Sequence, residues 1–184
     1  TNNLQSYASY IDTNAGFCND RTPYQKNAST NYQFVEGLGG YGTAFTAYGS
    51  GYRLNILGGA GASLGCKDND LFTVSTANHG NKSMTYPIGV ITADEVSMAG
   101  GVVNKNNTSY YLYRGGGESW TMSPRDYGQF SDTIIMLYLS ETGSLGVGIA
   151  TTEIGMRPVI NLKAGSNITG SGTGTDPYVV VGTV

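Results

Sequence analysis

Few side chains in this chain are suited to catalysis. His79 is the single histidine among 184 residues, and it lies in the polar stretch TANHGNKS, where no acid or nucleophile is placed beside it by a recognised motif. A serine or cysteine hydrolase needs a histidine as general base, oriented by a further polar group. We therefore interpret His79 as an exposed loop residue, expect no Gly-x-Ser-x-Gly nucleophile elbow, and predict that the protein is not an enzyme.

Two short motifs resemble ligand sites but lack essential parts. KDND, at Lys67 to Asp70, offers carboxylates to a calcium ion, yet the twelve-residue loop with its closing glutamate does not follow. RGGGES, at Arg114 to Ser119, resembles a phosphate loop without the Gly-Lys-Ser/Thr ending, and a strand pattern follows where a helix is required. We interpret the first as an Asx turn and the second as a hairpin turn, and we predict no metal ion and no cofactor.

The composition is typical of an extracellular domain. Only 12% of the residues are charged, whereas 28 are glycine and 14 are tyrosine, so Ser, Thr, Asn, Gly and Tyr must form much of the surface. A net charge of −3 without a basic cluster argues against nucleic-acid binding. Because no apolar run approaches the ~20 residues that cross a bilayer, we expect this segment not to insert into a membrane.

The two cysteines, Cys18 and Cys66, are far apart and stand in the loop-like contexts GFCNDR and LGCKDND. A metal site built on two cysteines would need histidine partners, and an oxidising compartment favours a bridge. We therefore expect a disulfide between them, with two separate free thiols as the alternative.

Apolar spacing predicts a sheet-rich second half. A short amphipathic helix is expected over 2–11, followed by a loop-rich region from 12 to 70 with a few short strands. A second helix is expected after Thr92, because Glu95 completes a capping box and Gly100 and Gly101 end the helical pattern. TIIMLYL, over 133–139, is apolar on both faces and should be a covered central strand. Further strands are expected over 70–76, 86–90, 110–115, 119–124, 155–162 and 178–181.

The segment between Pro124 and Gly155 combines aromatic residues with Ser, Thr, Gly and acidic residues around the apolar strand. Such a mixture is typical of paratopes, because tyrosine offers large contact area at little rotamer entropy and the small polar residues offer adaptable hydrogen bonds. The alternative is a pair of ordinary surface loops on a sheet.

The succession YPIGVITADEVSMAGG, YYLY, WTMSP, an irregular stretch, GMRPVINL and GSGTGTDPYVV resembles the C-type lectin-like domains of bacterial surface and phage proteins. Within that superfamily it most resembles the variable proteins diversified by retroelements and their relatives on pilin-like or surface-anchored chains. The resemblance covers about two thirds of the chain, from Leu71 to the end, with AGFCNDR at Ala15 to Arg21 as a weaker match upstream.

This resemblance implies an α+β protein with the C-type lectin-like fold, in which two short helices pack on a small twisted antiparallel sheet with long ordered loops. It implies one domain over 1–184, with an N-terminal helix and loop-rich part over 1–70, a core over 71–184 and a variable region over 125–152. The implied scaffold residues are Trp120, Pro124, Arg157 and Pro158. The implied ligand-binding residues are Arg125, Asp126, Tyr127, Gln129, Phe130, Ser131, Asp132, Thr142, Ser144, Ile149, Thr151 and Thr152, and Gly146 and Gly148 are further candidates for diversification.

The resemblance further implies a bacterial, extracellular or cell-surface domain that binds a protein or glycan ligand on another cell or surface and is attached through a segment outside this chain. The tripeptides with which C-type lectins coordinate calcium and sugar do not occur, so calcium-dependent sugar binding is not expected. The cysteines of the formylglycine-generating enzymes are also missing from the second half of the chain. The alternative function is that of a pilin-like structural subunit within a larger surface assembly, without a dedicated ligand.

Overall fold

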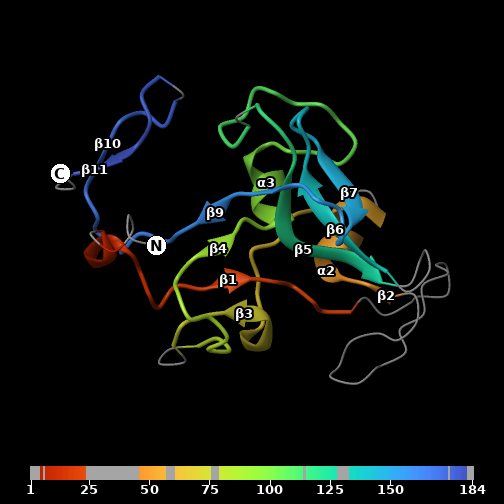
Figure 1. Ribbon diagram of the computed structural model, residues 1–184, viewed down its shortest axis with the longest axis horizontal. Helices are drawn as coiled ribbons and strands as arrows, with labels where there is room; N and C mark the ends of the chain where they lie inside the picture. Colours follow the sequence, from red (N-terminus) through yellow and green to blue (C-terminus); the bar gives the residue numbers. More distant parts are fainter. Residues whose placement is uncertain are drawn as a thin grey trace.

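The computed structural model describes residues 5, 7–23, 46–56, 61–75, 79–113, 115–127, 133–173 and 175–181. Within these residues the chain is α+β, with two short α-helices and several small sheets (Figure 1). The helices are α2 (Gly49–Gly51), which continues into the π-helical turn η2 (Tyr52–Ile56), and α3 (Ala93–Ala99). None of the described helices is long and apolar enough to cross a bilayer.

The largest described sheet has the strand order β2-β5-β6-β7, with β8 paired in parallel to β5. Its strands are β2 (Thr46–Ala47), β5 (Ser119–Tyr127), β6 (Ile134–Leu139), β7 (Leu145–Ile149) and β8 (Gly155–Met156). Two register shifts interrupt the β5–β6 pairing, one on each side of Pro124. Proline has no N–H to donate to a ladder, so irregular pairing at this position is expected. The shifts change which β5 residues face the core.

Strand β6 takes the predicted central position, between β5 and β7. Ile135, Leu137 and Leu139 are buried, as the two-residue period of a strand requires when one face covers a core. The other face is only half covered, and Ile134 is exposed, so the expectation of burial on both faces is wrong. Because β6 lies in an antiparallel sheet, one of its faces can remain open to solvent.

Helix α3 packs on the buried face of this sheet. Its Ala93 and Val96 join Leu137, Leu139 and Leu145 in one apolar cluster. The predicted capping box is confirmed, since the Glu95 amide donates to Thr92 Oγ1 at 3.1 Å and the Thr92 amide donates to Glu95 Oε2 at 2.8 Å. The helix ends at Gly100, whose φ of 124° disfavours a side chain.

Three two-stranded sheets join distant parts of the chain. β1 (Phe17–Cys18) pairs with β3 (Leu71–Phe72), and β4 (Gly89–Val90) pairs with β9 (Pro158–Val159). β10 (Ile168–Thr169) pairs with β11 (Val179–Val180). The first two sheets lie beside the central sheet, whereas the β10–β11 hairpin projects away from it near the N-terminal segment (Figure 1).

The N-terminal segment is held by the chain that leads into this hairpin. The 3-10 turn η1 (Ala8–Tyr10) precedes Asp12, whose amide donates to the Asn161 carbonyl at 2.8 Å. The Lys163 amide donates to the Tyr10 carbonyl at 2.9 Å. Of the helix predicted over 2–11, the structure describes Gln5, which is helical, and residues 7–11, in which Ala8–Tyr10 form the 3-10 turn η1. Residues 1–4 and 6 lie outside the described residues.

The strand predicted over 110–115 is a turn in the described residues 110–113. Tyr110 is buried there and donates its hydroxyl to the Gly143 carbonyl at 2.8 Å, while the Tyr113 amide closes the turn on the Tyr110 carbonyl at 3.0 Å. Packing of a single ring has thus overridden the strand preference of YYLY. Of the strand predicted over 70–76, the described part contains β3, whose two residues pair with β1, and residue 76 lies outside the described residues.

Candidate functional site

The predicted ligand-binding residues do not form one patch. Arg125, Asp126 and Tyr127 end strand β5, and Ile149 ends β7 next to the same end of the sheet. The turn that holds Thr142 and Ser144 lies at the opposite end of the β6–β7 hairpin, where Leu139 pairs with Leu145. Thr151 and Thr152 are exposed in the turn after β7. Gln129, Phe130, Ser131 and Asp132 lie outside the described residues.

Three of these residues face the interior, contrary to expectation. Asp126 is 0% exposed and pairs with Arg125, whose side chain is itself largely covered. Ser144 is buried, with its Oγ 2.8 Å from Ser140 Oγ. The register shifts around Pro124 explain the burial of Asp126, because they place it opposite Ile135 on the core side. Arg125, Asp126 and Ser144 are therefore parts of the support and are not presented to a partner.

Three of the four implied scaffold residues lie in strand pairs, and the fourth, Arg157, bonds to turns. Trp120 packs edge to face on Tyr138, and Pro124 is paired with Met136 between the two register shifts. Pro158 pairs with Val90 across the β4–β9 sheet. Arg157 makes two long hydrogen bonds, of 3.5 Å each, to the carbonyls of Leu112 and Gly117.

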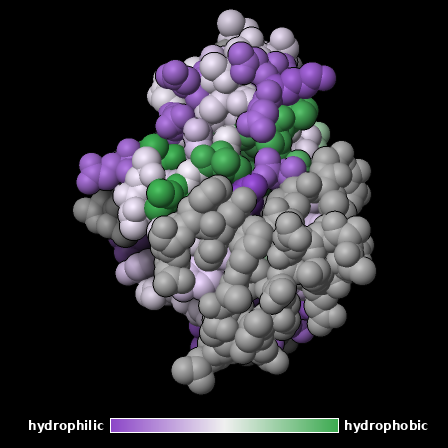
Figure 2. All heavy atoms as spheres, turned by 90° about the vertical axis from the view of Figure 1, so that its right-hand side faces the viewer, coloured by the Kyte–Doolittle hydropathy of each residue, from purple (hydrophilic) through white to green (hydrophobic). Residues whose placement is uncertain are grey.

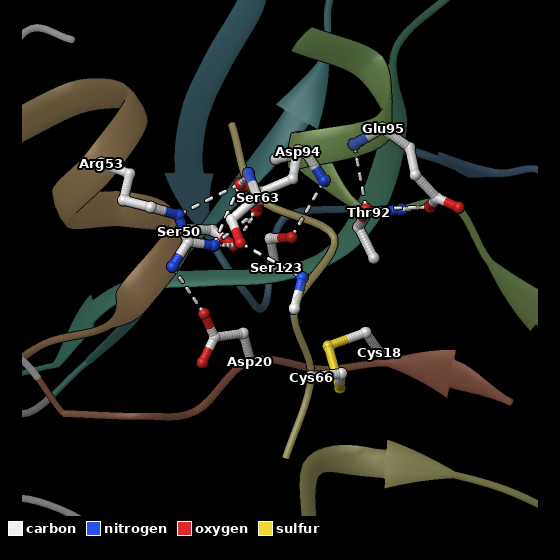
Figure 3. Close-up of polar contacts among 12 residues, drawn as sticks. Cys18, Asp20, Ser50, Arg53, Ser63, Cys66, Thr92, Asp94, Glu95 and Ser123 are labelled. Carbon is white, nitrogen blue, oxygen red and sulfur yellow. Dashed lines mark hydrogen bonds and ion pairs between the residues drawn. A yellow bond between two sulfur atoms is a disulfide. The ribbon is translucent and has the colours of Figure 1, made fainter. Parts of the chain in front are cut away.

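The expected disulfide between Cys18 and Cys66 is confirmed. It forms one wall of a pocket of about 330 Å3 whose opposite wall is the start of α3 (Figure 3). The pocket, which we call the disulfide pocket, has an apolar floor that includes Phe17 and Val90. Its polar wall contains Asp20, Ser50, Ser63, Thr92, Asp94, Glu95 and Ser123.

Asp94 is the centre of the polar wall, and both oxygens of its carboxylate already accept hydrogen bonds. It is 3% exposed and accepts hydrogen bonds from Ser50 Oγ, from the Arg53 guanidinium at 3.0 Å and from the Ser63 amide at 2.8 Å. Arg53 also reaches Asp20 at 2.8 Å. A buried carboxylate that is paired and hydrogen-bonded in this way holds segments together, here α2, the segment 61–67 and α3.

The expectation that the chain has no Gly-x-Ser-x-Gly motif is wrong for the sequence, because one such motif lies in the same wall. Residues 61–65 read Gly-Ala-Ser-Leu-Gly, which is the spacing of the nucleophile elbow. That elbow requires a turn from a strand into a helix, but residues 61–67 are neither strand nor helix. Ser63 Oγ accepts from the Gly65 amide at 3.1 Å. His79 is exposed, as predicted, and no described hydrogen bond joins it to Ser63 or Ser50.

The two other motifs also take structural positions. Asp68, Asn69 and Asp70 form the 3-10 turn η3 ahead of β3, and Asp70 binds Arg21 with an N–O distance of 3.0 Å. Gly115, Gly116 and Gly117 all have positive φ and form a turn into β5, but the strand that would make it a hairpin is not present in the described residues before it. Within the described ranges, no three His, Cys, Asp or Glu side chains gather to hold a metal ion.

A second pocket is more suited to recognition. It has a volume of about 510 Å3. It lies where the end of β5 and the start of β6 meet the segment that follows β1. We call it the tyrosine pocket. Its lining residues are Asn19, Arg21, Tyr48, Pro124, Tyr127, Ile134 and Met136.

Strand register explains the apolar wall of the tyrosine pocket. Pro124 is paired with Met136, and Tyr127 is paired with Ile134. Because directly paired residues of antiparallel strands project from the same face, these four side chains form one continuous surface. This face is the partly open side of the sheet, away from the α3 core.

Two polar residues border that apolar wall. Arg21 is fixed by Asp70, by a 2.8 Å hydrogen bond to the Asn69 carbonyl and by its position over the Phe72 ring, 5.3 Å from the centroid. Asn19 is held through its backbone amide, which donates to the Asp70 carbonyl at 2.8 Å. Its side-chain Oδ1 is buried and accepts no hydrogen bond in the described structure. An unpaired buried acceptor costs free energy, and because solvent does not reach this atom, it belongs to the packing of the wall and is not presented to a ligand.

Hydrophobic residues also gather next to this end of the sheet. The edge strand β7, on the right in Figure 1, exposes Val147 and Ile149. The face of the molecule seen from that side carries a band of hydrophobic residues below a hydrophilic region (Figure 2). Of the predicted ligand-binding residues in the described structure, Tyr127 and Ile149 lie at this end and are at least partly exposed.

Comparisons of the chain with protein-family models, with curated proteins and with solved structures found no match.

Proposed function

We propose that this chain is a non-catalytic recognition domain of the bacterial cell surface, built on a C-type lectin-like fold, and that it binds a protein or glycan partner. The partner is held in the tyrosine pocket, with Tyr127 as the main apolar anchor. Sequence resemblance supports the fold and the cell-surface setting. The architecture is compatible with that fold in general terms, since both are α+β with two short helices on small sheets.

The observation that carries the proposal is the composition of the tyrosine pocket. Binding sites for small ligands and side chains are concave and mostly apolar, with a few fixed polar groups that provide specificity. Here two tyrosines, a proline, an isoleucine and a methionine form the apolar part, and Asn19 and Arg21 provide the polar part. The guanidinium of Arg21 is already oriented by Asp70, so its position costs little to maintain on binding.

The described chemistry favours binding over catalysis. The most reactive-looking cluster, around Ser50 and Asp94, uses the carboxylate as a hydrogen-bond centre for Arg53 and the Ser63 amide. A nucleophilic serine needs a base that takes its proton and is itself held in place by a third group. The Ser50 hydroxyl donates instead to a carboxylate that is paired with arginine.

The disulfide and the low charge support an extracellular setting. A bridge between Cys18 and Cys66 persists in oxidising compartments, such as the cell surface, and is rare in the cytosol. A surface of small polar residues and tyrosine also carries little charge. It therefore exerts no strong long-range attraction, which suits a protein that meets many partners.

A second function is favoured by a separate observation. The β10–β11 hairpin projects from the body and exposes apolar side chains on both faces, as a subunit of a surface assembly would. A structural subunit would use such contacts for assembly and would need no ligand in the tyrosine pocket.

Methionine methyl resonances offer a direct test of the pocket. Met136 lines it, whereas Met98 lies on α3 and Met156 on β8. The chain, labelled with 13C at the methionine methyls, would be titrated with a panel of methyl glycosides and short tyrosine-containing peptides. We expect at least one probe to shift Met136 while Met98 and Met156 stay in place. If no probe shifts Met136, the pocket is not a site for these ligand classes and the proposal fails.

The Tyr127→Ala variant gives the matching energetic test. Removal of a central aromatic anchor should cost about 2 kcal/mol of binding, or roughly thirtyfold in affinity, with little change in thermal unfolding. Tyr86→Ala is the matched control, since Tyr86 is exposed and does not line the pocket. Equal affinities of the two variants would contradict the role given to Tyr127.

A further inference from the structure

The segment over 61–66, which we call the strap, is attached to the rest of the protein at few points. It is neither helix nor strand, and it makes no backbone–backbone hydrogen bond with another described residue. One of its amides is bound, since the Ser63 N–H donates to Asp94 Oδ1 at 2.8 Å. The other attachment is covalent, through the disulfide of Cys66 with Cys18. The strap passes Asp94 on its way to the disulfide (Figure 3).

Packing adds little to these two attachments. Ser63, Leu64 and the two glycines of the strap are exposed, Leu64 by 64%. Beyond the chain neighbours, a Cβ at Gly61 would meet no atom within 4 Å, and a Cβ at Gly65 would meet Ser63 Oγ alone, at 3.3 Å. Segments with few buried contacts open locally at a low free energy. The disulfide is therefore the main restraint on the strap.

The two cysteines are held differently apart from their bridge. Cys18 lies in β1 and is paired with Leu71 of β3, so the sheet holds it without the disulfide. Cys66 lies in the strap, just before Lys67, whose carbonyl accepts from the amides of Asp70 and Leu71 at 2.9 Å each. If the bridge opens, Cys18 stays in its sheet, whereas Cys66 moves with the strap about Lys67.

The strap forms part of the wall of three pockets. Its residues line the disulfide pocket, a second pocket of about 450 Å3 and a third of about 350 Å3. Asp20 lines the first and the second pocket, and Arg53 lines the second and the third. Because the pockets share these residues, displacement of the strap joins them into one polar cleft around Arg53.

We propose that the strap is a redox-controlled cover: a dithiol that reduces the disulfide between Cys18 and Cys66 releases the strap and opens the cleft around Arg53, while the sheets stay folded. This inference does not depend on the tyrosine pocket, which has no strap residue in its lining.

The exchange needs a dithiol that reaches the bridge. Both cysteines are partly exposed and line the disulfide pocket. One thiolate of the dithiol attacks one sulfur of the bridge and forms a mixed disulfide, and the other cysteine leaves as a thiolate that takes up a proton. The second thiol of the reagent, after losing its proton, displaces the remaining cysteine. The two cysteines thus gain two electrons, and the dithiol is oxidised to its own disulfide.

Thiol alkylation tests the release of the strap. The chain, reduced with dithiothreitol under native conditions, would be pulsed with iodoacetamide, and the rate at each cysteine would be divided by its rate in concentrated urea. We expect Cys66 to react at least tenfold faster than Cys18 on this scale. The single variants Cys18→Ser and Cys66→Ser, which each keep one thiol, should repeat the difference without reductant. The fluorescence of Trp120 should keep its folded emission in all of these chains.

Hydrogen exchange gives an independent readout of the same movement. After reduction the Ser63 amide loses its bond to Asp94 and should exchange as fast as in an unstructured peptide. The Val96 amide, which donates to the Thr92 carbonyl at 3.1 Å within the buried helix α3, should remain protected.

Four results overturn this inference. Equal relative alkylation rates, or a Ser63 amide that stays protected in the reduced chain, would show that the strap is not released. A Trp120 emission that matches the urea-unfolded chain after reduction would show that the bridge holds the whole fold. A disulfide that dithiothreitol reduces only in urea would show that the bridge is closed to exchange in the folded protein.

Discussion

The Trp120 indole meets the Tyr138 ring edge to face, with centroids 5.9 Å apart and planes at 87°. The two residues are direct partners in the β5–β6 pairing, and the glycines of β7 lie next to them. A Cβ at Gly146 would approach the Tyr138 ring to 2.5 Å, whereas one at Gly148 would stay 3.3 Å from Trp120. Gly146 is therefore a packing position, which disagrees with the expectation that it tolerates diversification.

We predict that Gly146→Ala lowers the free energy of unfolding by about 1–2 kcal/mol, because the added methyl forces the Tyr138 ring to move. Gly148→Ala, with its wider clearance, should change it by less than half as much. Trp120 is the single tryptophan of the chain, so its fluorescence during denaturant unfolding reports both variants. Equal stability of the two variants would show that the Tyr138 ring yields without cost.

The capping box of α3 leads to a second prediction. Thr92→Ala removes the acceptor for the Glu95 amide at 3.1 Å and should destabilise the protein by about 1 kcal/mol. Thr92→Ser retains the hydroxyl and should stay close to the unmodified protein. Chemical denaturation monitored by circular dichroism distinguishes them, and a serine variant as unstable as the alanine variant would shift the cause from capping to the lost methyl group.

The disulfide should carry a large share of the stability. Cys18 and Cys66 are separated by 48 positions, and closing a loop of this length stabilises a protein by about 4 kcal/mol in the chain-entropy model. We expect the double variant Cys18→Ser with Cys66→Ser to lose about that amount in urea unfolding. Reduction of the unmodified protein is the control and should have the same effect. A loss below about 1 kcal/mol would mean that the unfolded chain is already compact around this loop.

A fourth prediction concerns Asp126. Burial raises the pKa of this carboxyl above its ordinary value, and the neighbouring Arg125 offsets only part of that rise. The folded state then binds the proton more tightly than the unfolded state. Asp126 therefore contributes its full stabilisation when the pH is below the ordinary aspartate pKa. This stabilisation is lost as the pH rises through the raised pKa of the folded state.

Asp126→Asn cannot ionise and should lose this pH dependence. We expect its melting temperature at neutral pH to equal or exceed that of the unmodified protein, and the advantage to vanish in acid below the ordinary aspartate pKa. Calorimetry across the acidic to neutral range checks this. A clearly less stable asparagine variant at neutral pH would show that the ion pair with Arg125 outweighs the cost of burial.

Some features of the protein could be predicted from neighbouring residues in the sequence. Thr92 and Glu95 define a helix start by themselves, because both hydrogen bonds of a capping box lie within four residues. The apolar run of β6 predicts a strand in the middle of a sheet. With only two cysteines, the pairing of Cys18 with Cys66 had a single intramolecular solution. His79, without an acid or nucleophile near it in the sequence, was correctly assigned to an exposed loop.

The predicted binding surface was less accurate, because the orientation of β5 residues depends on register. Two shifts around Pro124 turn Asp126 toward the core and leave Tyr127 on the open face. A two-residue alternation counted from Trp120 assumes regular pairing, and local sequence does not reveal how many residues a bulge inserts. Ser63 is a separate case, because its Gly-x-Ser-x-Gly spacing matches a nucleophile elbow while residues 61–67 form neither the strand nor the helix that the elbow requires.

The sequence by itself therefore determined the parts that depend on contacts within a few residues: the helix start at Thr92, the apolar strand β6, the paired cysteines and the scarcity of catalytic groups. Tertiary structure decided the rest. The tyrosine pocket joins Asn19, Tyr48 and Met136, which are far apart in the chain, and the Asp94 network joins three separate segments. Such sites exist only once strand register and loop closure have brought distant residues together, because each side chain alone has too little surface or charge to specify its partners.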